Sequence, residues 1–127
     1  MKHKYLHELF PKVLPFPYGE RGYQKFDKRD TFNLDSTLIM WLYEHLRYFQ
    51  DVVAKKVVMD DPTWRTYEVD GEQLTQLQCI DRMVEDCKAI LLYDELKDKD
   101  DQEWSKIDAD KDDLFKVLSK VYWAMWW

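Results

Sequence analysis

Residues 21–29 bring together the side chains best suited to holding a ligand. Four cations alternate there with two aromatic rings, namely Arg21, Tyr23, Lys25, Phe26, Lys28 and Arg29. Cations pair with phosphate and aromatic rings stack on bases, so the pattern predicts a site for a nucleotide or a single strand. The alternative is a surface arm whose two rings pack into the core while its cations face water.

The chain ends with three tryptophans, Trp123, Trp126 and Trp127. Their spacing cannot place all three rings on one side of a helix. One or two are expected in the core, and a ring left exposed would mark an interface, because aromatic residues dominate binding hot spots. We therefore expect either a self-association surface or a cluster that closes the end of the helical core over the N-terminal arm.

An acidic run resembles the start of an EF-hand calcium loop. Asp108, Asp110 and Asp112 have the alternate spacing of the first ligands. The sixth and twelfth positions of the loop need Gly and a bidentate Glu, but Asp113 and Ser119 stand there. We interpret the run as the acidic start of a helix, since acidic residues are favourable at the positive end of the helix dipole.

Other chemical motifs are also incomplete. His3 and His7 are spaced to face the same way on a helix, but only Glu8 lies near as a further ligand. His45 has the chemistry of a base, without a nucleophile beside it in the sequence. The chain contains no glycine-rich phosphate loop and no nucleophile elbow. We expect no enzymatic activity, no metal and no cofactor.

The composition predicts one helical domain spanning residues 1–127. Hydrophobic residues make up 46% of the 127 residues, and there are three Gly and four Pro. Large apolar side chains supply a core, and few helix breakers favour long helices. Seven Lys/Arg against four Asp/Glu give residues 1–30 a charge of +3, whereas the whole chain carries −6. We therefore divide it into a basic N-terminal arm, 1–32, and a helical core, 33–127.

The overall negative charge disfavours binding to duplex DNA, whose phosphates attract basic proteins. Residues 94–113 form an acidic tract, which is expected to be a solvated connection up to about residue 108. The alternative is a protein-blocking module, in which this tract imitates a nucleic-acid backbone and occupies a basic groove of a partner.

Apolar spacing predicts three main helices packed as a small antiparallel bundle, an all-α fold, with a short helix at 2–10. The first main helix begins near Asn33 or Asp35 and ends near residue 56, and the third begins near 108–112. Asp70 and Gln73 resemble a capping box that starts the second. Trp64, Thr66, Tyr67 and Val69 fit a short extended piece that ends at Asp70-Gly71, and the pattern leaves open whether residues 57–71 form a strand. The expected buried stripes are Leu38, Leu42, Leu46, Phe49 and Val53; Leu77, Ile80, Val84, Cys87 and Leu91; and Leu114, Val117, Leu118, Val121 and Met125. Arg82, Glu85, Asp86 and Lys88 are expected on the outer side of the second.

Several features point to the cytoplasm of the producing or host cell. Cys79 and Cys87 lie eight residues apart on the predicted second helix, too far for a disulfide between them. Buried thiols suit a reducing compartment. No apolar run reaches the length of a membrane span, and the first residues lack the apolar segment of a signal peptide.

Several short motifs resemble those of small uncharacterised bacteriophage and prophage proteins. They are Gly22-Tyr23, the run from Arg29 to Thr37 with its Phe32-Asn33-Leu34-Asp35, Leu46-Arg47-Tyr48-Phe49, Leu74 to Val84 with Cys79-Ile80-Asp81-Arg82-Met83, Asp113-Leu114-Phe115, and the terminal Trp126-Trp127. The resemblance implies a phage anti-defence protein that sequesters a nucleotide immune signal or occludes a host defence protein by contact. A phage assembly factor is the third alternative.

Overall fold

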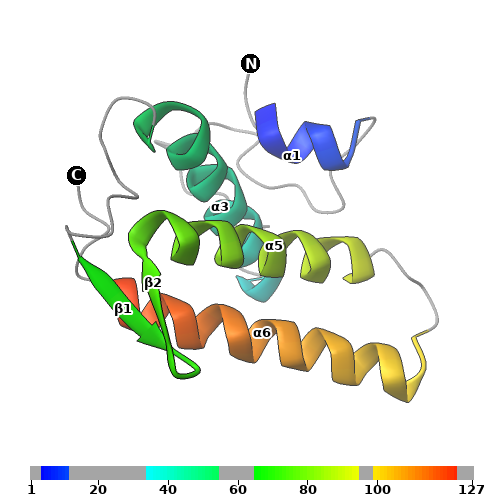
Figure 1. Ribbon diagram of the computed structural model, residues 1–127. Helices are drawn as coiled ribbons and strands as arrows, with labels where there is room; N and C mark the ends of the chain where they lie inside the picture. The colour runs from blue at the N-terminus through cyan, green and yellow to red at the C-terminus, as the bar shows by residue number, and fades with distance from the viewer. Residues whose placement is uncertain (1–3, 12–33, 55–64, 95–98, 123–127) are drawn as a thin grey trace.

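The computed structural model describes residues 4–11, 34–54, 65–94 and 99–122. The described chain is mostly helical, and it adds a two-stranded antiparallel hairpin that the all-α prediction lacks (Figure 1). The elements are α1 (Lys4–Leu9), α3 (Leu34–Tyr48), the π-helix η1 (Phe49–Val53), β1 (Thr66–Val69), β2 (Glu72–Thr75), α5 (Gln76–Asp94) and α6 (Asp101–Val121). None of the helices in these ranges is long and apolar enough to cross a membrane.

The hairpin turns at Asp70 and Gly71. Both residues have positive φ, 53° and 81°, which is the conformation of a type I′ turn and explains the Asp-Gly pair. The extended piece expected before Asp70-Gly71 is observed as strand β1, and β2 pairs with it from Glu72 to Thr75, while Trp64 lies outside the described residues. The predicted capping box at Asp70 is therefore wrong, because these residues turn a hairpin instead of starting a helix.

The true capping box of α5 begins at Thr75. The Thr75 hydroxyl accepts the backbone N–H of Gln78 at 3.2 Å, and the Gln78 side chain accepts the backbone N–H of Thr75 at 2.9 Å. Each side chain thus satisfies a backbone donor that the first turn of the helix leaves free. This Thr-x-x-Gln pattern lies five residues after the Asp70 pattern in the sequence.

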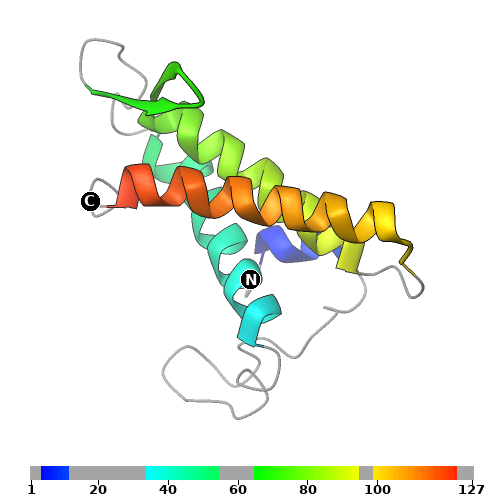
Figure 2. The ribbon, with the colours of Figure 1, turned by 90° about the horizontal axis from the view of Figure 1, so that it is seen from below.

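Helices α5 and α6 lie side by side and antiparallel, while α3 crosses this pair steeply on the other side of α5 (Figures 1 and 2). The predicted antiparallel arrangement thus holds for α5 and α6, and α3 departs from it.

Buried side chains from α1, α3, η1, β1, α5 and α6 form one hydrophobic cluster. The α5 stripe is confirmed: Leu77 is partly buried, and Ile80, Val84, Cys87 and Leu91 are buried. Both cysteines are buried and unbonded.

Helix α3 buries a wider face than its predicted stripe. Leu42, Leu46 and Phe49 are buried as expected, but Leu38 is exposed. Ile39, Met40 and Tyr43 are buried in addition. The wider face follows from packing, because α3 lies against both α1 and α5 and is therefore covered from two directions.

Helix α6 begins seven residues before the earliest predicted start. Asp100 is its N-cap, and the Asp100 side chain accepts the backbone N–H of Glu103 at 2.8 Å. Most of the expected acidic connection is therefore helical, which corrects that prediction. Leu114, Val117 and Val121 are buried and Leu118 is partly buried, whereas Met125 lies outside the described residues.

The short helix α1 confirms the element expected over residues 2–10. It packs on α3. Tyr5, Leu6 and the following Phe10 are buried. The Tyr5 hydroxyl donates to Asp51 Oδ2 of η1 at 2.8 Å. Burial is the largest cause that raises the pKa of Tyr5 to about 12, and this hydrogen bond is the second.

Candidate binding face on the last helix

Both sets of site residues predicted from the sequence lie outside the described part of the chain. The arm residues Arg21, Tyr23, Lys25, Phe26, Lys28 and Arg29 fall within 12–33, and Trp123, Trp126 and Trp127 fall within 123–127. Their assignment as ligand and interface residues therefore stays a prediction. The third feature singled out from the sequence, the acidic tract, is described from residue 99 onwards.

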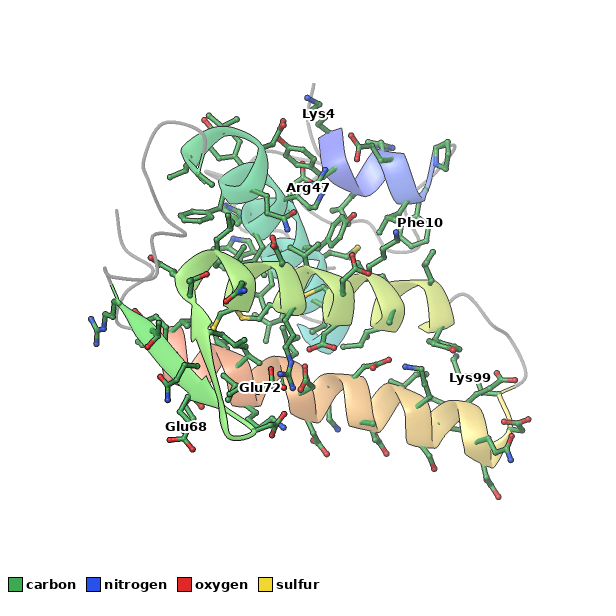
Figure 3. All side chains as sticks on the ribbon, in the orientation of Figure 1. Lys4, Phe10, Arg47, Glu68, Glu72 and Lys99 are labelled. Carbon is green, nitrogen blue, oxygen red and sulfur yellow. The ribbon has the colours of Figure 1, made fainter. Side chains whose placement is uncertain are left out.

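The N-terminal half of α6 displays the acidic tract on a regular helix. Asp101, Asp108 and Asp112 are exposed, and Glu103, Asp110 and Asp113 are half-buried. Acidic residues in the first turns interact favourably with the helix dipole. Figure 3 shows oxygen-tipped side chains along the side of α6 that faces away from α5, and Lys99 near its start. A helix holds these carboxylates at fixed spacings, which a solvated connection would not.

Three aromatic side chains of the last helical segment are exposed as well. Trp104, Phe115 and Tyr122 have relative exposures of 51%, 41% and 60%. Their spacings of 11 and 7 residues are close to three and two helical turns, so the rings follow one side of the segment. Lys99 Nζ lies 4.9 Å from the centre of the Trp104 ring. Exposed aromatics next to carboxylates make this side of α6 suited to contact a protein.

Helix α3 carries a second exposed aromatic group. The rings of Trp41 and His45 stack with centres 4.2 Å apart, and Tyr48 is also exposed. His45 Nδ1 lies 2.8 Å from the carbonyl oxygen of Trp41, one turn earlier in the same helix. His45 is exposed, whereas Cys79 and Cys87 are buried in the core. Burial raises the pKa of both thiols, which disfavours the reactive thiolate.

An ion-pair network fixes α6 to α5 and to the hairpin turn. Arg82 of α5 donates to both oxygens of Asp113, with Nε 2.9 Å from Oδ2, and its Nη2 lies 2.7 Å from Asp70 Oδ2. Lys116 Nζ completes the network at 2.8 Å from Asp70 Oδ1. Bidentate Arg–carboxylate pairing fixes geometry as well as charge. Hydrogen bonding to Arg82 is the largest cause that lowers the pKa of Asp113, to about 2.

Asp86 is the most perturbed carboxyl group beside this network. We expected it on the outer side of the helix, but it is half-buried, and its Oδ2 is buried without a hydrogen-bond partner. Burial, then a hydrogen bond to Asp113 and the negative charges of Asp113 and Asp110, raise the pKa of Asp86 to about 8. Two carboxyl groups can share a hydrogen bond only if one is protonated. The pair is a structural contact between α5 and α6, on the flank of the candidate face.

The described residues contain no group of three or more His, Cys, Asp or Glu side chains placed to hold a metal. Asp108, Asp110 and Asp112 lie within α6, and a helical backbone cannot form an EF-hand loop.

The chain matches no protein-family model, and searches of curated proteins and of solved structures return no match.

Proposed function

We propose that this is a non-enzymatic phage protein that counters host defence by covering a basic surface of a host protein. The proposal rests on the exposed side of α6, where carboxylates and aromatic rings lie together on one helix that is packed into the core. Aromatic residues supply contact area at interfaces, and complementary charge steers association and fixes register. The phage context is supported by the motif resemblance, and it would place the protein in the host cytoplasm.

The rigidity of α6 favours occlusion over a loose acidic tail. A disordered segment must be ordered when it binds, and that entropy is subtracted from its affinity. Here Asp100 caps the helix, Leu114, Val117 and Val121 anchor it in the core, and Arg82 holds it to α5. The acidic surface is therefore already in its binding conformation.

Affinity capture from host cells tests this proposal. The bait is the full chain, and the matched variant carries Asp101→Asn, Asp108→Asn and Asp112→Asn, three exposed positions whose neutralisation keeps side-chain size. We expect a defined host protein to bind the bait and to be released by added salt or by duplex DNA. Its affinity for the variant should be at least tenfold lower than its affinity for the wild-type chain. Equal binding of bait and variant by every captured protein would contradict the proposal.

Sequestration of a nucleotide immune signal is the alternative that the arm supports. Arg21, Lys25, Lys28 and Arg29 would contact phosphates, and Tyr23 or Phe26 would stack on a base. Thermal-shift measurements with cyclic and linear nucleotide signals test it, with Lys25→Ala combined with Arg29→Ala as the variant. Stabilisation of the wild-type chain that this variant loses would support sequestration, and no stabilisation by any nucleotide would refute it.

A further inference from the structure

A groove of about 360 Å³ lies where α1, α3 with η1, and α5 meet. Its volume is at the small end of the range for ligand sites. Leu9 and Val84 give it an apolar part, and Tyr43, Arg47, Gln50, Glu8, Glu85 and Lys88 supply polar groups. None of these residues belongs to α6, so the groove is separate from the proposed binding face.

The groove contains both signs of charge in equal number. Arg47 and Lys88 are its cations, and Glu8 and Glu85 are its anions. Among the described residues, neither Lys88 nor Glu85 makes an ion pair or side-chain hydrogen bond, and both are exposed. A lone phosphate would meet two carboxylates here. A molecule that itself carries one positive and one negative group would find a partner for each.

Arg47 is positioned to receive the negative group. Its Nη1 donates to Gln50 Oε1 at 2.7 Å, and Gln50 in turn donates to Asp81 Oδ1 at 2.7 Å. The guanidinium carbon lies 5.0 Å from the centre of the Tyr5 ring. Arg47 also forms an ion pair with Glu8, with Nη2 3.7 Å from Oε2, a separation longer than a hydrogen bond. The side chain is therefore oriented by its neighbours, yet it keeps donors for a carboxylate.

The backbone of the groove is itself unusual. Gln50 belongs to η1, whose π-helical turn is closed by a bond from the Ala54 N–H to the Phe49 carbonyl. Short π-helical turns are rare and occur frequently at functional sites. In this protein the turn begins directly after α3 and carries Gln50, which holds Arg47 in place.

We infer that the groove binds a small zwitterion of the dipeptide class. The carboxylate of the ligand pairs with Arg47 and Lys88, its ammonium group pairs with Glu85 and Glu8, and an apolar side chain covers Leu9 and Val84. Charge-assisted hydrogen bonds orient such a ligand, and the apolar contact adds affinity. This site is independent of the surface proposed to cover a host protein.

Isothermal titration of the full chain with alanyl-leucine tests the inference. The comparison ligands are the N-acetylated and the C-amidated dipeptide, each of which lacks one charge, and inorganic phosphate. We expect saturable binding of the free dipeptide, binding at least tenfold weaker for each capped form, and none for phosphate. No saturable binding, or equal binding of capped and free forms, would overturn the inference.

Variants locate the binding in the groove. Lys88→Gln and Glu85→Gln are each expected to lower the affinity for the dipeptide at least fivefold. In the wild-type chain, the NMR amide resonances of Arg47 and Gln50 are expected to shift on titration. Lys120→Gln and Glu72→Gln are the matched controls, because both positions are exposed on elements that do not line the groove. Equal weakening in the controls, or unchanged affinity in both groove variants, would show that the groove is not the site.

Discussion

The Glu44 carboxylate of α3 accepts the backbone N–H of Leu6 at 2.9 Å, and it also accepts the N–H of Tyr5 at 3.2 Å. Glu44 is buried, and these two donors lie in the first turn of α1. A helix of six residues is too short to be stable alone. A cap supplied from another helix therefore fixes where α1 begins and holds it on α3.

Replacing Glu44 with alanine should destabilise the protein. The change leaves two buried backbone donors without an acceptor, which costs about 1–3 kcal/mol. Urea unfolding followed by circular dichroism measures the loss, and hydrogen exchange of the α1 amides should accelerate. Glu72→Ala, at an exposed position, should change the free energy of unfolding by no more than about 0.5 kcal/mol. Equal losses in the two variants would refute the role of Glu44.

The capping box of α5 gives a second prediction. Thr75→Ala removes the side-chain acceptor at the N-cap, and such changes cost about 0.5–2 kcal/mol of stability. Gln73→Ala, which alters only the exposed bond from the Thr66 hydroxyl, should cost less. Chemical denaturation of both variants measures the difference. A larger loss for Gln73→Ala would favour a cap at Asp70 instead of Thr75.

The hairpin turn makes a third prediction. Gly71 has a φ of +81°, and an added Cβ would meet no atom within 4 Å. Gly71→Ala is therefore expected to lose about 1–2 kcal/mol through backbone strain, without steric clash. Gly71→Asn should lose less, because Asn tolerates this conformation better. Thermal unfolding compares the two, and full stability of Gly71→Ala would show that the turn has another conformation.

The carboxyl pair of Asp86 and Asp113 should make stability depend on pH. Asp86 has a pKa raised to about 8, so in the range from about pH 4 to 8 the folded protein binds a proton that the unfolded chain releases. The free energy of unfolding then falls as pH rises through this range, by at most about 1.4 kcal/mol per pH unit for one proton. Asp113, with its pKa lowered to about 2, acts oppositely: its contribution is lost as pH falls from about 4 to 2.

Asp86→Asn isolates this effect, because asparagine keeps the size of the side chain and carries no charge. We expect the variant to be more stable than wild type at pH 8 and to lose most of the decline between pH 4 and 8. Urea unfolding at several pH values measures this decline in stability, with Asp112→Asn, at an exposed position of α6, as the control. A decline that persists unchanged in Asp86→Asn would mean that other groups cause it.

The sequence by itself determined the helices whose apolar residues recur at helical spacing. The stripe of α5 was correct because Ile80, Val84, Cys87 and Leu91 meet the core in any packing that buries one side of that helix. The extended piece before Asp70-Gly71 also followed from local pattern, whereas its pairing as a strand with residues 72–75 did not. The start of α5 was misplaced because Asp70 fits both a helix cap and a type I′ turn, and Gly71 with positive φ decides for the turn.

Only the tertiary structure decided which polar residues meet. Arg82 and Asp113 are 31 residues apart, Glu44 and Leu6 are 38 apart, and no local pattern indicates either pair. The first turns of α6 were also missed, since the acidic residues before 108 suggest a solvated connection, whereas the Asp100 cap starts the helix at Asp101. The groove residues come from α1, α3, η1 and α5, so it exists only once these elements have packed together.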